Sequence, residues 1–178
     1  GADSNVLEIG CGQGRIAFPL RYVLWGRGTY DGFDIDRSKI ERLQRTFTPA
    51  HPRFNFQFAD VRNTFYNPGG AVEGHEFRFP YPDDSFDVVF AASVFTHLGP
   101  RAAARYFEES ARVLRPGGRC VFSFFLLDNY RSGQPRPLGF GRSMFDFEHR
   151  HPDWDDRVAI VEPVNPEQMT AYADSLVC

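Results

Sequence analysis

Short apolar runs alternate along this chain with segments whose apolar residues recur every three or four positions. The runs predict strands and the helical spacings predict helices. The strands are expected at Val6–Ile9, Tyr30–Asp34, Phe54–Phe58, Phe86–Ala91 and Arg119–Leu126, and the helices at Gln13–Leu24, Arg37–Phe47 and Arg101–Leu114. Strands that alternate with helices are typical of a parallel sheet built from βαβ units. The pattern therefore predicts an α/β fold.

Two long stretches interrupt this alternation. Val61–Asp84 contains Asn67-Pro68-Gly69-Gly70, and residues 128–166 are rich in Pro, Gly, Arg and Asp, so both are expected to be loops. Loops of this length are often lids or binding loops. Both follow the carboxyl ends of predicted strands, so we expect them at the edge of the sheet where open α/β sheets bind ligands. After them, Asn165 and Pro166 are typical of a helix start, which predicts a helix over Pro166–Cys178.

Length and composition limit the class of protein. The chain has 178 residues, the size of one domain, and a net charge of -3, which gives no basic footprint for nucleic acid or for an anionic membrane. No apolar stretch reaches the roughly 18 residues of a membrane span, and no signal peptide is recognisable. Cys11, Cys120 and Cys178 are too widely spaced for a disulfide framework or a zinc site. A cytoplasmic protein without a metal site is expected.

The first predicted strand runs into the sequence Glu8-Ile9-Gly10-Cys11-Gly12-Gln13-Gly14. Glycines at alternate positions allow a tight turn and bring the backbone close to a ligand. A strand, a glycine turn and a helix form the unit at which α/β sheets bind adenosine-containing cofactors. Gly12, Gly14 and Ala17 also satisfy the dinucleotide fingerprint, with Asp34 at about the distance of a ribose-binding residue. On this motif alone, a nicotinamide or flavin oxidoreductase is an alternative.

Three further motifs favour another family. They are Phe58-Ala59-Asp60-Val61, Phe86-Asp87-Val88-Val89-Phe90, and Ala111-Arg112-Val113-Leu114-Arg115-Pro116-Gly117-Gly118. Together with Glu8 and the glycine loop, they resemble class I S-adenosylmethionine-dependent methyltransferases over residues 5 to 127. The resemblance implies a Rossmann-like three-layer sandwich with strand order 3-2-1-4-5. The complete family fold has seven strands, so residues 1–178 are expected to be a single core domain, truncated at both ends and lacking the closing antiparallel hairpin.

The same resemblance implies a binding site for S-adenosylmethionine. The residues beside the amino-acid part of the cofactor would be Glu8, Gly10, Cys11, Gly12 and Gly14. Asp34 would accept hydrogen bonds from the ribose hydroxyls, and Ile35 would pack on the adenine. Asp60 would receive the adenine amino group, with Val61 beside it. Asp36 also follows the second strand, and one of the two aspartates is expected to cap the next helix instead.

The residues after the fourth strand would border the methyl group. Ala92 and Ser93 would line the cofactor near its sulfur, and His97 is a candidate general base. Methyl transfer is a direct displacement, so a base is needed only if the acceptor must lose a proton. A second interpretation of His97 is that it caps or packs at the start of the next helix. His75, His149 and His151 are interpreted as solvated loop residues.

The acceptor is expected to be a small molecule. The chain has Ala92-Ser93-Val94-Phe95 where enzymes that methylate exocyclic amino groups of nucleic-acid bases carry an Asn/Asp-Pro-Pro-Tyr tetrapeptide. Two alternatives use the same cofactor site. One is an aminopropyl-type transferase, and the other is a non-catalytic regulatory domain that binds the cofactor.

Overall fold

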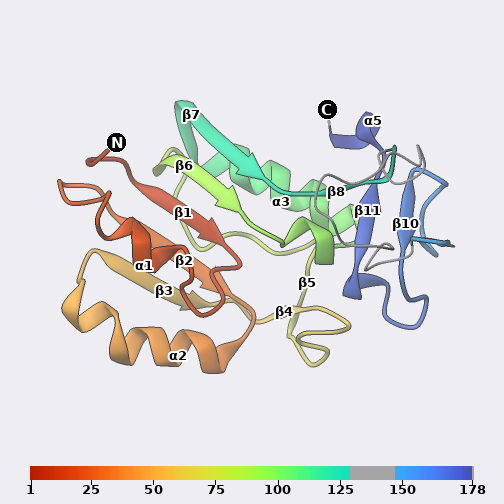
Figure 1. Cartoon of the computed structure of the whole chain (residues 1–178), viewed down its shortest axis with the longest axis horizontal. Helices are drawn as coiled ribbons and strands as arrows, with labels where there is room; N and C mark the ends of the chain where they lie inside the picture. The colour runs from red at the N-terminus through yellow and green to blue at the C-terminus, as the bar shows by residue number, and fades with distance from the viewer. Residues whose placement is uncertain (129–146, 178) are drawn as a thin grey trace, which may run out of the picture.

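The computed structural model describes residues 1–128 and 147–177. Its centre is a five-stranded parallel sheet in the order β3-β2-β1-β6-β7 (Figure 1). The strands are β1 Val6–Ile9, β2 Tyr30–Asp34, β3 Phe54–Phe58, β6 Phe86–Ala91 and β7 Leu114–Phe122. Because β6 and β7 are the fourth and fifth strands of this sheet along the chain, the predicted order 3-2-1-4-5 is confirmed.

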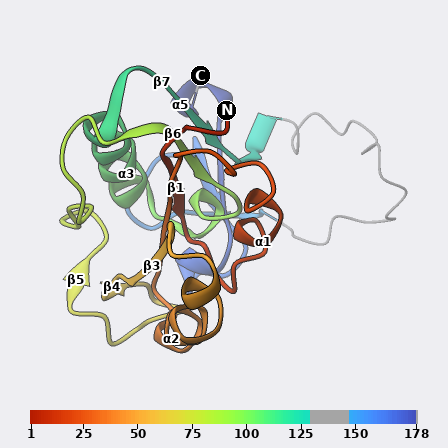
Figure 2. The same cartoon turned by 90° about the vertical axis from the view of Figure 1, so that its left-hand side faces the viewer.

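Helices cover both faces of this sheet. α1 (Ala17–Leu20) and α2 (Arg37–Thr46) lie on one face, and α3 (Pro100–Val113) lies on the other, as Figure 2 shows. Side chains of a strand point alternately to the two faces. On β2, Tyr30 therefore packs in the cluster under α1 and α2, while Phe33 packs in the cluster under α3. These three layers confirm the predicted α/β sandwich.

The first predicted helix is wrong over most of its length. Only Ala17–Leu20 of the expected Gln13–Leu24 is α-helical, and turns flank it on both sides. Gly14 has a φ of +83°, a left-handed conformation that a right-handed helix cannot include. A helix can therefore begin only after the glycine loop has ended. The second and third predicted helices are confirmed to within one residue at each end.

The fifth predicted strand is divided between two sheets. β7 begins earlier than expected, at Leu114, and Arg115–Gly118 form an irregularity in its pairing with β6. Gly117, at a φ of +81°, allows this bend inside the strand. β7 then ends at Phe122, and β8 (Phe125–Leu126) belongs to another sheet. The single strand expected over Arg119–Leu126 is therefore a wrong prediction.

The second sheet has four strands in the order β8-β11-β10-β9, and Figure 1 shows it beyond the carboxyl ends of the first. β9 is His149–Arg150, β10 is Val158–Ile160 and β11 is Thr170–Tyr172. β11 pairs antiparallel with β10 and parallel with β8. Between β10 and β11 lies the 3₁₀ helix η3 (Pro166–Gln168), and α5 (Asp174–Val177) follows β11.

Two sequence-based predictions fail in this region. The helix over Pro166–Cys178 is wrong, because only η3 starts at Pro166 and the Asn165 side chain makes no capping hydrogen bond. The loop expected over residues 128–166 is wrong only where β9 and β10 form, at His149–Arg150 and Val158–Ile160. β10 is fully buried, and its backbone pairs with a strand on both edges, β11 and β9. Residues 129–146 of that loop lie outside the described residues.

The other predicted loop, Val61–Asp84, is largely confirmed. It contains only two short paired strands, β4 (Val61–Arg62) and β5 (Val72–Glu73). It then returns along α3, where the backbone N–H of Phe79 donates to a carboxylate oxygen of Glu109 at 2.8 Å. Two further 3₁₀ turns, η1 (Thr48–Ala50) and η2 (Phe95–His97), complete the described elements. No helix within residues 1–128 or 147–177 is both long and apolar enough to span a bilayer.

Candidate functional site

A cavity of about 340 Å³ opens at the carboxyl ends of β1, β2 and β6. This is the edge at which open α/β sheets bind ligands, and small-molecule sites usually measure about 300–1,000 Å³. Loops after these strands form most of the wall, and η3 of the second sheet region adds Glu167. The expected site residues that line the cavity are Gly10, Asp34, Ile35, Val61, Ala92, Ser93 and His97.

The glycine loop approaches the cavity with its backbone. Gly10, Gly12 and Gly14 have φ values of +69°, +53° and +83°. A Cβ on Gly10 would lie 2.3 Å from Cγ2 of Val94, so no side chain fits there. The backbone N–H of Gly10 donates to the Phe33 carbonyl oxygen at 2.9 Å, which extends the β1–β2 pairing beyond the strand. The loop is thus held rigidly beside the end of β2.

Asp34 faces the cavity with a partly satisfied carboxylate. Its Oδ2 accepts a hydrogen bond from Gly12 N at 2.7 Å, and its Oδ1 accepts one from Asp36 N at 2.8 Å. Each carboxylate oxygen accepts two hydrogen bonds, so both retain capacity for a ligand diol. Asp36 caps α2 instead, because its Oδ1 accepts from Lys39 N at 3.2 Å. A hydrogen bond from Ser38, followed by interactions with Lys39, lowers the pKa of Asp36 to about 2.

The remaining expected residues do not line the cavity. Glu8 is 3% exposed, and its carboxylate accepts a hydrogen bond from the Tyr30 hydroxyl in the layer under α1 and α2. Burial raises the pKa of Glu8 to about 7. Cys11 packs in the same apolar cluster, where burial raises the pKa of its thiol. Asp60 is exposed, and its Oδ1 accepts from Asn67 Nδ2 at 3.4 Å. Contacts of these side chains with a cofactor remain predictions.

His97 lies at the other end of the cavity, in η2. Its Nδ1 lies 2.7 Å from the carbonyl oxygen of Gln168, which can only accept, so Nδ1 carries the proton and Nε2 keeps a lone pair. Its ring packs edge-on against Tyr66 with centroids 5.0 Å apart. Asn63 Nδ2 donates to the backbone carbonyl of His97 at 2.9 Å. Burial lowers the pKa of His97, so the neutral imidazole predominates near pH 7.

Sequence reasoning missed several cavity residues. Glu167 reaches the cavity from η3, and its Oε2 accepts from Thr64 N at 2.6 Å. No local pattern marks Glu167, because its position depends on the second sheet. Tyr106 lies within the predicted helix Arg101–Leu114, and its helical position alone did not indicate that it lines the cavity. Arg15 follows the glycine loop directly, and among residues 1–128 and 147–177 it forms no ion pair.

Comparison with known proteins identifies the family of this fold. A family model described as a methyltransferase domain matches residues 6–118. The chain belongs to the class I S-adenosylmethionine-dependent methyltransferases. Two of the methyltransferases that match are each 33% identical to it. The 27-O-demethylrifamycin SV methyltransferase of Amycolatopsis mediterranei matches over 128 residues, covering 71% of this chain and 40% of that protein. The fatty-acid O-methyltransferase of Mycolicibacterium smegmatis matches over 119 residues, covering 67% of this chain and 36% of that protein.

A solved structure supports the fold of this methyltransferase. PKMT2 from Rickettsia typhi, in complex with AdoHcy, superimposes with a TM-score of 0.57 at 18% identity, covering 73% of this chain and 22% of that one. The methyltransferase chain spans only about 40% of the length of curated relatives that it matches. Membership of the family removes the dinucleotide oxidoreductase as an alternative.

The cavity fits the family's cofactor, S-adenosylmethionine. Asp34 offers two carboxylate oxygens to a ribose, Ile35 and Val61 offer apolar walls to a flat base, and Gly10 leaves room for close approach. Arg15 adds a cation without an ion-pair partner among the described residues, which suits a carboxylate. Across the described part of the chain, no three His, Cys, Asp or Glu side chains converge as metal ligands.

Proposed function

We propose that this methyltransferase transfers the methyl group of S-adenosylmethionine to a hydroxyl oxygen of a small molecule. The observation that carries the proposal is the tautomer of His97, fixed by the 2.7 Å contact with the Gln168 carbonyl. Nε2 is thereby left as an acceptor on a residue that lines the same cavity as Asp34 and Gly10. A neutral imidazole so held is suited to remove a hydroxyl proton.

The cofactor supplies an electrophilic methyl group on a sulfonium sulfur. Bond formation between the acceptor oxygen and that carbon would break the carbon–sulfur bond and leave its electron pair on sulfur. The hydroxyl proton passes to Nε2 of His97. The edge contact with Tyr66 and the bond to Gln168 hold the ring in one orientation. A positioned base of this kind contributes about 10²–10⁴-fold to turnover.

The proposal includes the cofactor contacts. Asp34 accepts hydrogen bonds from the ribose diol, Ile35 and Val61 enclose the adenine, and Ala92 and Ser93 lie near the sulfur. Arg15 pairs with the carboxylate of the amino-acid part, which lies along the glycine loop.

The acceptor class rests on two supports. The two relatives named above are O-methylating enzymes by name, one for a rifamycin and one for a fatty acid. The chain's net charge of -3 offers no basic surface for a nucleic acid. A small acceptor that bears a hydroxyl group is consistent with both. The cytoplasmic location remains a prediction from the sequence.

The test is a radiolabelled methyl-transfer assay against a panel of alcohols, phenols and carboxylic acids, repeated with His97→Asn, His97→Ala and the control His51→Asn. His51 packs on Phe47, outside the cavity wall. We expect the His97 variants to lose about 10²–10⁴-fold in kcat with unchanged cofactor affinity, and His51→Asn to keep wild-type turnover. Near-normal turnover in both His97 variants would leave that residue only a structural role. Aminopropyl transfer in place of methyl transfer would refute the proposed function.

A further inference from the structure

Tyr106 is a buried tyrosine whose hydroxyl makes no hydrogen bond with any residue in the described ranges. The residue is 3% exposed and lies in the middle of α3. Its ring is surrounded by the aromatic rings of Phe33, Phe77, Phe79 and Phe95. Two other buried tyrosines are paired: the Tyr172 hydroxyl donates to the Leu98 carbonyl at 2.5 Å, and the Tyr30 hydroxyl donates to Glu8.

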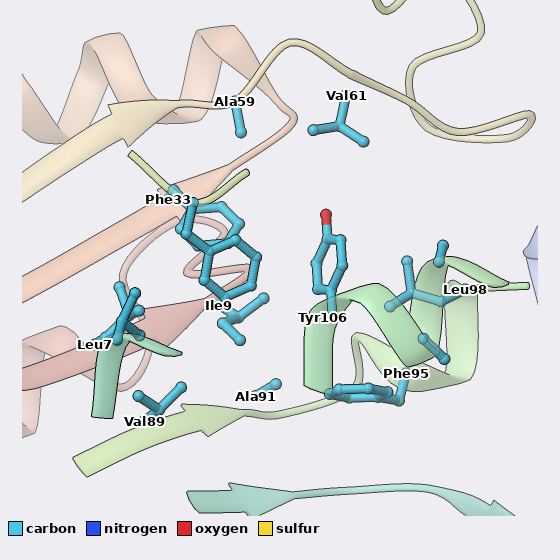
Figure 3. Close-up of a cluster of buried hydrophobic side chains, with 14 of the residues drawn as sticks. Leu7, Ile9, Phe33, Ala59, Val61, Val89, Ala91, Phe95, Leu98 and Tyr106 are labelled. Atoms are coloured by element: carbon cyan, nitrogen blue, oxygen red, sulfur yellow. The ribbon is translucent and has the colours of Figure 1, made fainter. Parts of the chain in front are cut away.

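The Tyr106 hydroxyl reaches the floor of the cofactor cavity. Figure 3 shows the ring rising from α3, with its oxygen directed toward Val61 and the ring lying between Phe33 and Leu98. Tyr106 lines the cavity together with Val61 and Leu98. Polar groups of largely buried residues in native proteins are usually hydrogen-bonded to protein, to a ligand or to water. The cavity is where this hydroxyl can find a partner.

The neighbours of Tyr106 indicate which part of the ligand it meets. Val61, Leu98 and Ala102 make this part of the wall apolar, as suits a flat aromatic base. Asp34, the proposed ribose ligand, lines the same cavity as Tyr106. The Asp34 carboxylate is close enough to the Tyr106 phenol to interact with it electrostatically. Burial, followed by the Asp34 charge, raises the pKa of Tyr106, so the hydroxyl stays protonated and can donate. Adenine carries ring nitrogens that accept hydrogen bonds.

We propose that the Tyr106 hydroxyl donates a hydrogen bond to a ring nitrogen of the adenine and thereby selects an adenine nucleoside. This inference rests on the proposed function, because it requires the cofactor in the cavity. It assigns to α3 a specificity-determining residue that lies outside the glycine loop and the strand ends. It also explains why a polar group persists inside an aromatic cluster.

The experiment compares Tyr106→Phe with a matched control, Tyr81→Phe. The Tyr81 hydroxyl is buried without a hydrogen-bond partner, and Tyr81 does not line the cavity. S-adenosylhomocysteine and 5′-methylthioadenosine are titrated calorimetrically into the wild type and both variants. We expect Tyr106→Phe to bind both ligands about five- to tenfold more weakly, by the same factor, while Tyr81→Phe binds as the wild type does. The ligand-free melting temperature of Tyr106→Phe should equal or exceed that of the wild type, because an unpaired hydroxyl is removed.

A second measurement needs no variant of the protein. The wild type is titrated with the 1-deaza, 3-deaza and 7-deaza analogues of 5′-methylthioadenosine, and one of them should lose about the same five- to tenfold factor. Equal affinities across these analogues, unchanged binding by Tyr106→Phe, or a loss confined to S-adenosylhomocysteine would each overturn the inference. Failure of the wild type to bind either parent ligand would instead refute the proposed function, and the inference with it.

Discussion

The backbone N–H of Gly12 donates a 2.7 Å hydrogen bond to Oδ2 of Asp34. This bond ties the glycine loop after β1 to the last residue of β2. The same carboxylate accepts a second backbone N–H, from Asp36, on its other oxygen. Asp34 is therefore held in place by the backbone before any ligand arrives, and its orientation toward the cavity costs little on binding.

The glycine loop provides the first prediction. Gly10→Ala introduces both a left-handed alanine and a Cβ 2.3 Å from Val94 Cγ2, whereas Gly117→Ala introduces a left-handed alanine in open space. We expect Gly117→Ala to lower the free energy of unfolding by about 1–2 kcal/mol. Gly10→Ala should cost about 1–3 kcal/mol more, because the steric overlap adds to the backbone strain. Urea unfolding of the two variants measures the difference, and equal losses would show that Val94 moves aside freely.

The raised pKa of Glu8 predicts how the stability of the fold depends on pH. Burial raises its pKa in the folded state from 4.5 to about 7. The folded chain therefore holds a proton that the unfolded chain has released between these values, and stability falls as pH rises from about 4.5 through 7. The loss amounts to on the order of 3 kcal/mol. Glu8→Gln keeps an acceptor oxygen for Tyr30 and should remove this dependence. If the free energy of unfolding changed with pH in the same way in the wild type and in Glu8→Gln between pH 5 and 8, the pKa assigned to Glu8 would be contradicted.

Glu109 anchors the long loop to α3. Its carboxylate accepts from Phe79 N at 2.8 Å and pairs with Arg112 and, at 3.1 Å, with Arg105. Glu109→Ala should cost about 3–5 kcal/mol of unfolding free energy, because it leaves buried donors unpaired. The adjacent Glu108 is exposed and pairs only with Arg105, so Glu108→Ala should cost less than about 1 kcal/mol. Amide exchange at Phe79 should accelerate only in Glu109→Ala, and acceleration in both variants would argue against a specific anchor.

The sequence was sufficient to predict the strands of the main sheet whose signal is local. Val6–Ile9 is a short apolar run that is buried throughout and flanked by polar and glycine residues. β10 and β11 lacked such a signal, because each is only three residues long, and β11 also depends on β8, which is distant in sequence. Asn165 and Pro166 are a local signal for a helix start, but only the 3₁₀ helix η3 forms there. The chain then continues as β11, which pairs with β8 and β10.

The residues of the candidate site also divide into those that a local sequence pattern indicates and those whose position depends on the tertiary structure. Gly10 could be predicted because it directly follows β1, and Asp34 because it is the last residue of β2, both at the carboxyl edge of the sheet. Glu8 was expected at the ligand, but its side chain points from β1 into the layer that contains Tyr30. Glu167 reaches the cavity only because the second sheet packs against η2, which no local pattern could indicate.

The central claim is that S-adenosylmethionine binds in the cavity that Gly10 of the glycine loop and Asp34 line. Calorimetric titration of S-adenosylhomocysteine into the wild type, Asp34→Asn and the control Asp31→Asn tests it most directly. Asp31 lies on the same strand but does not line the cavity. We expect Asp34→Asn to weaken binding by about 1.5–3 kcal/mol, the scale of hydrogen bonds to a charged group, and Asp31→Asn to bind as the wild type does. No binding to the wild type, or equal affinity in all three proteins, would contradict the assignment of this cavity.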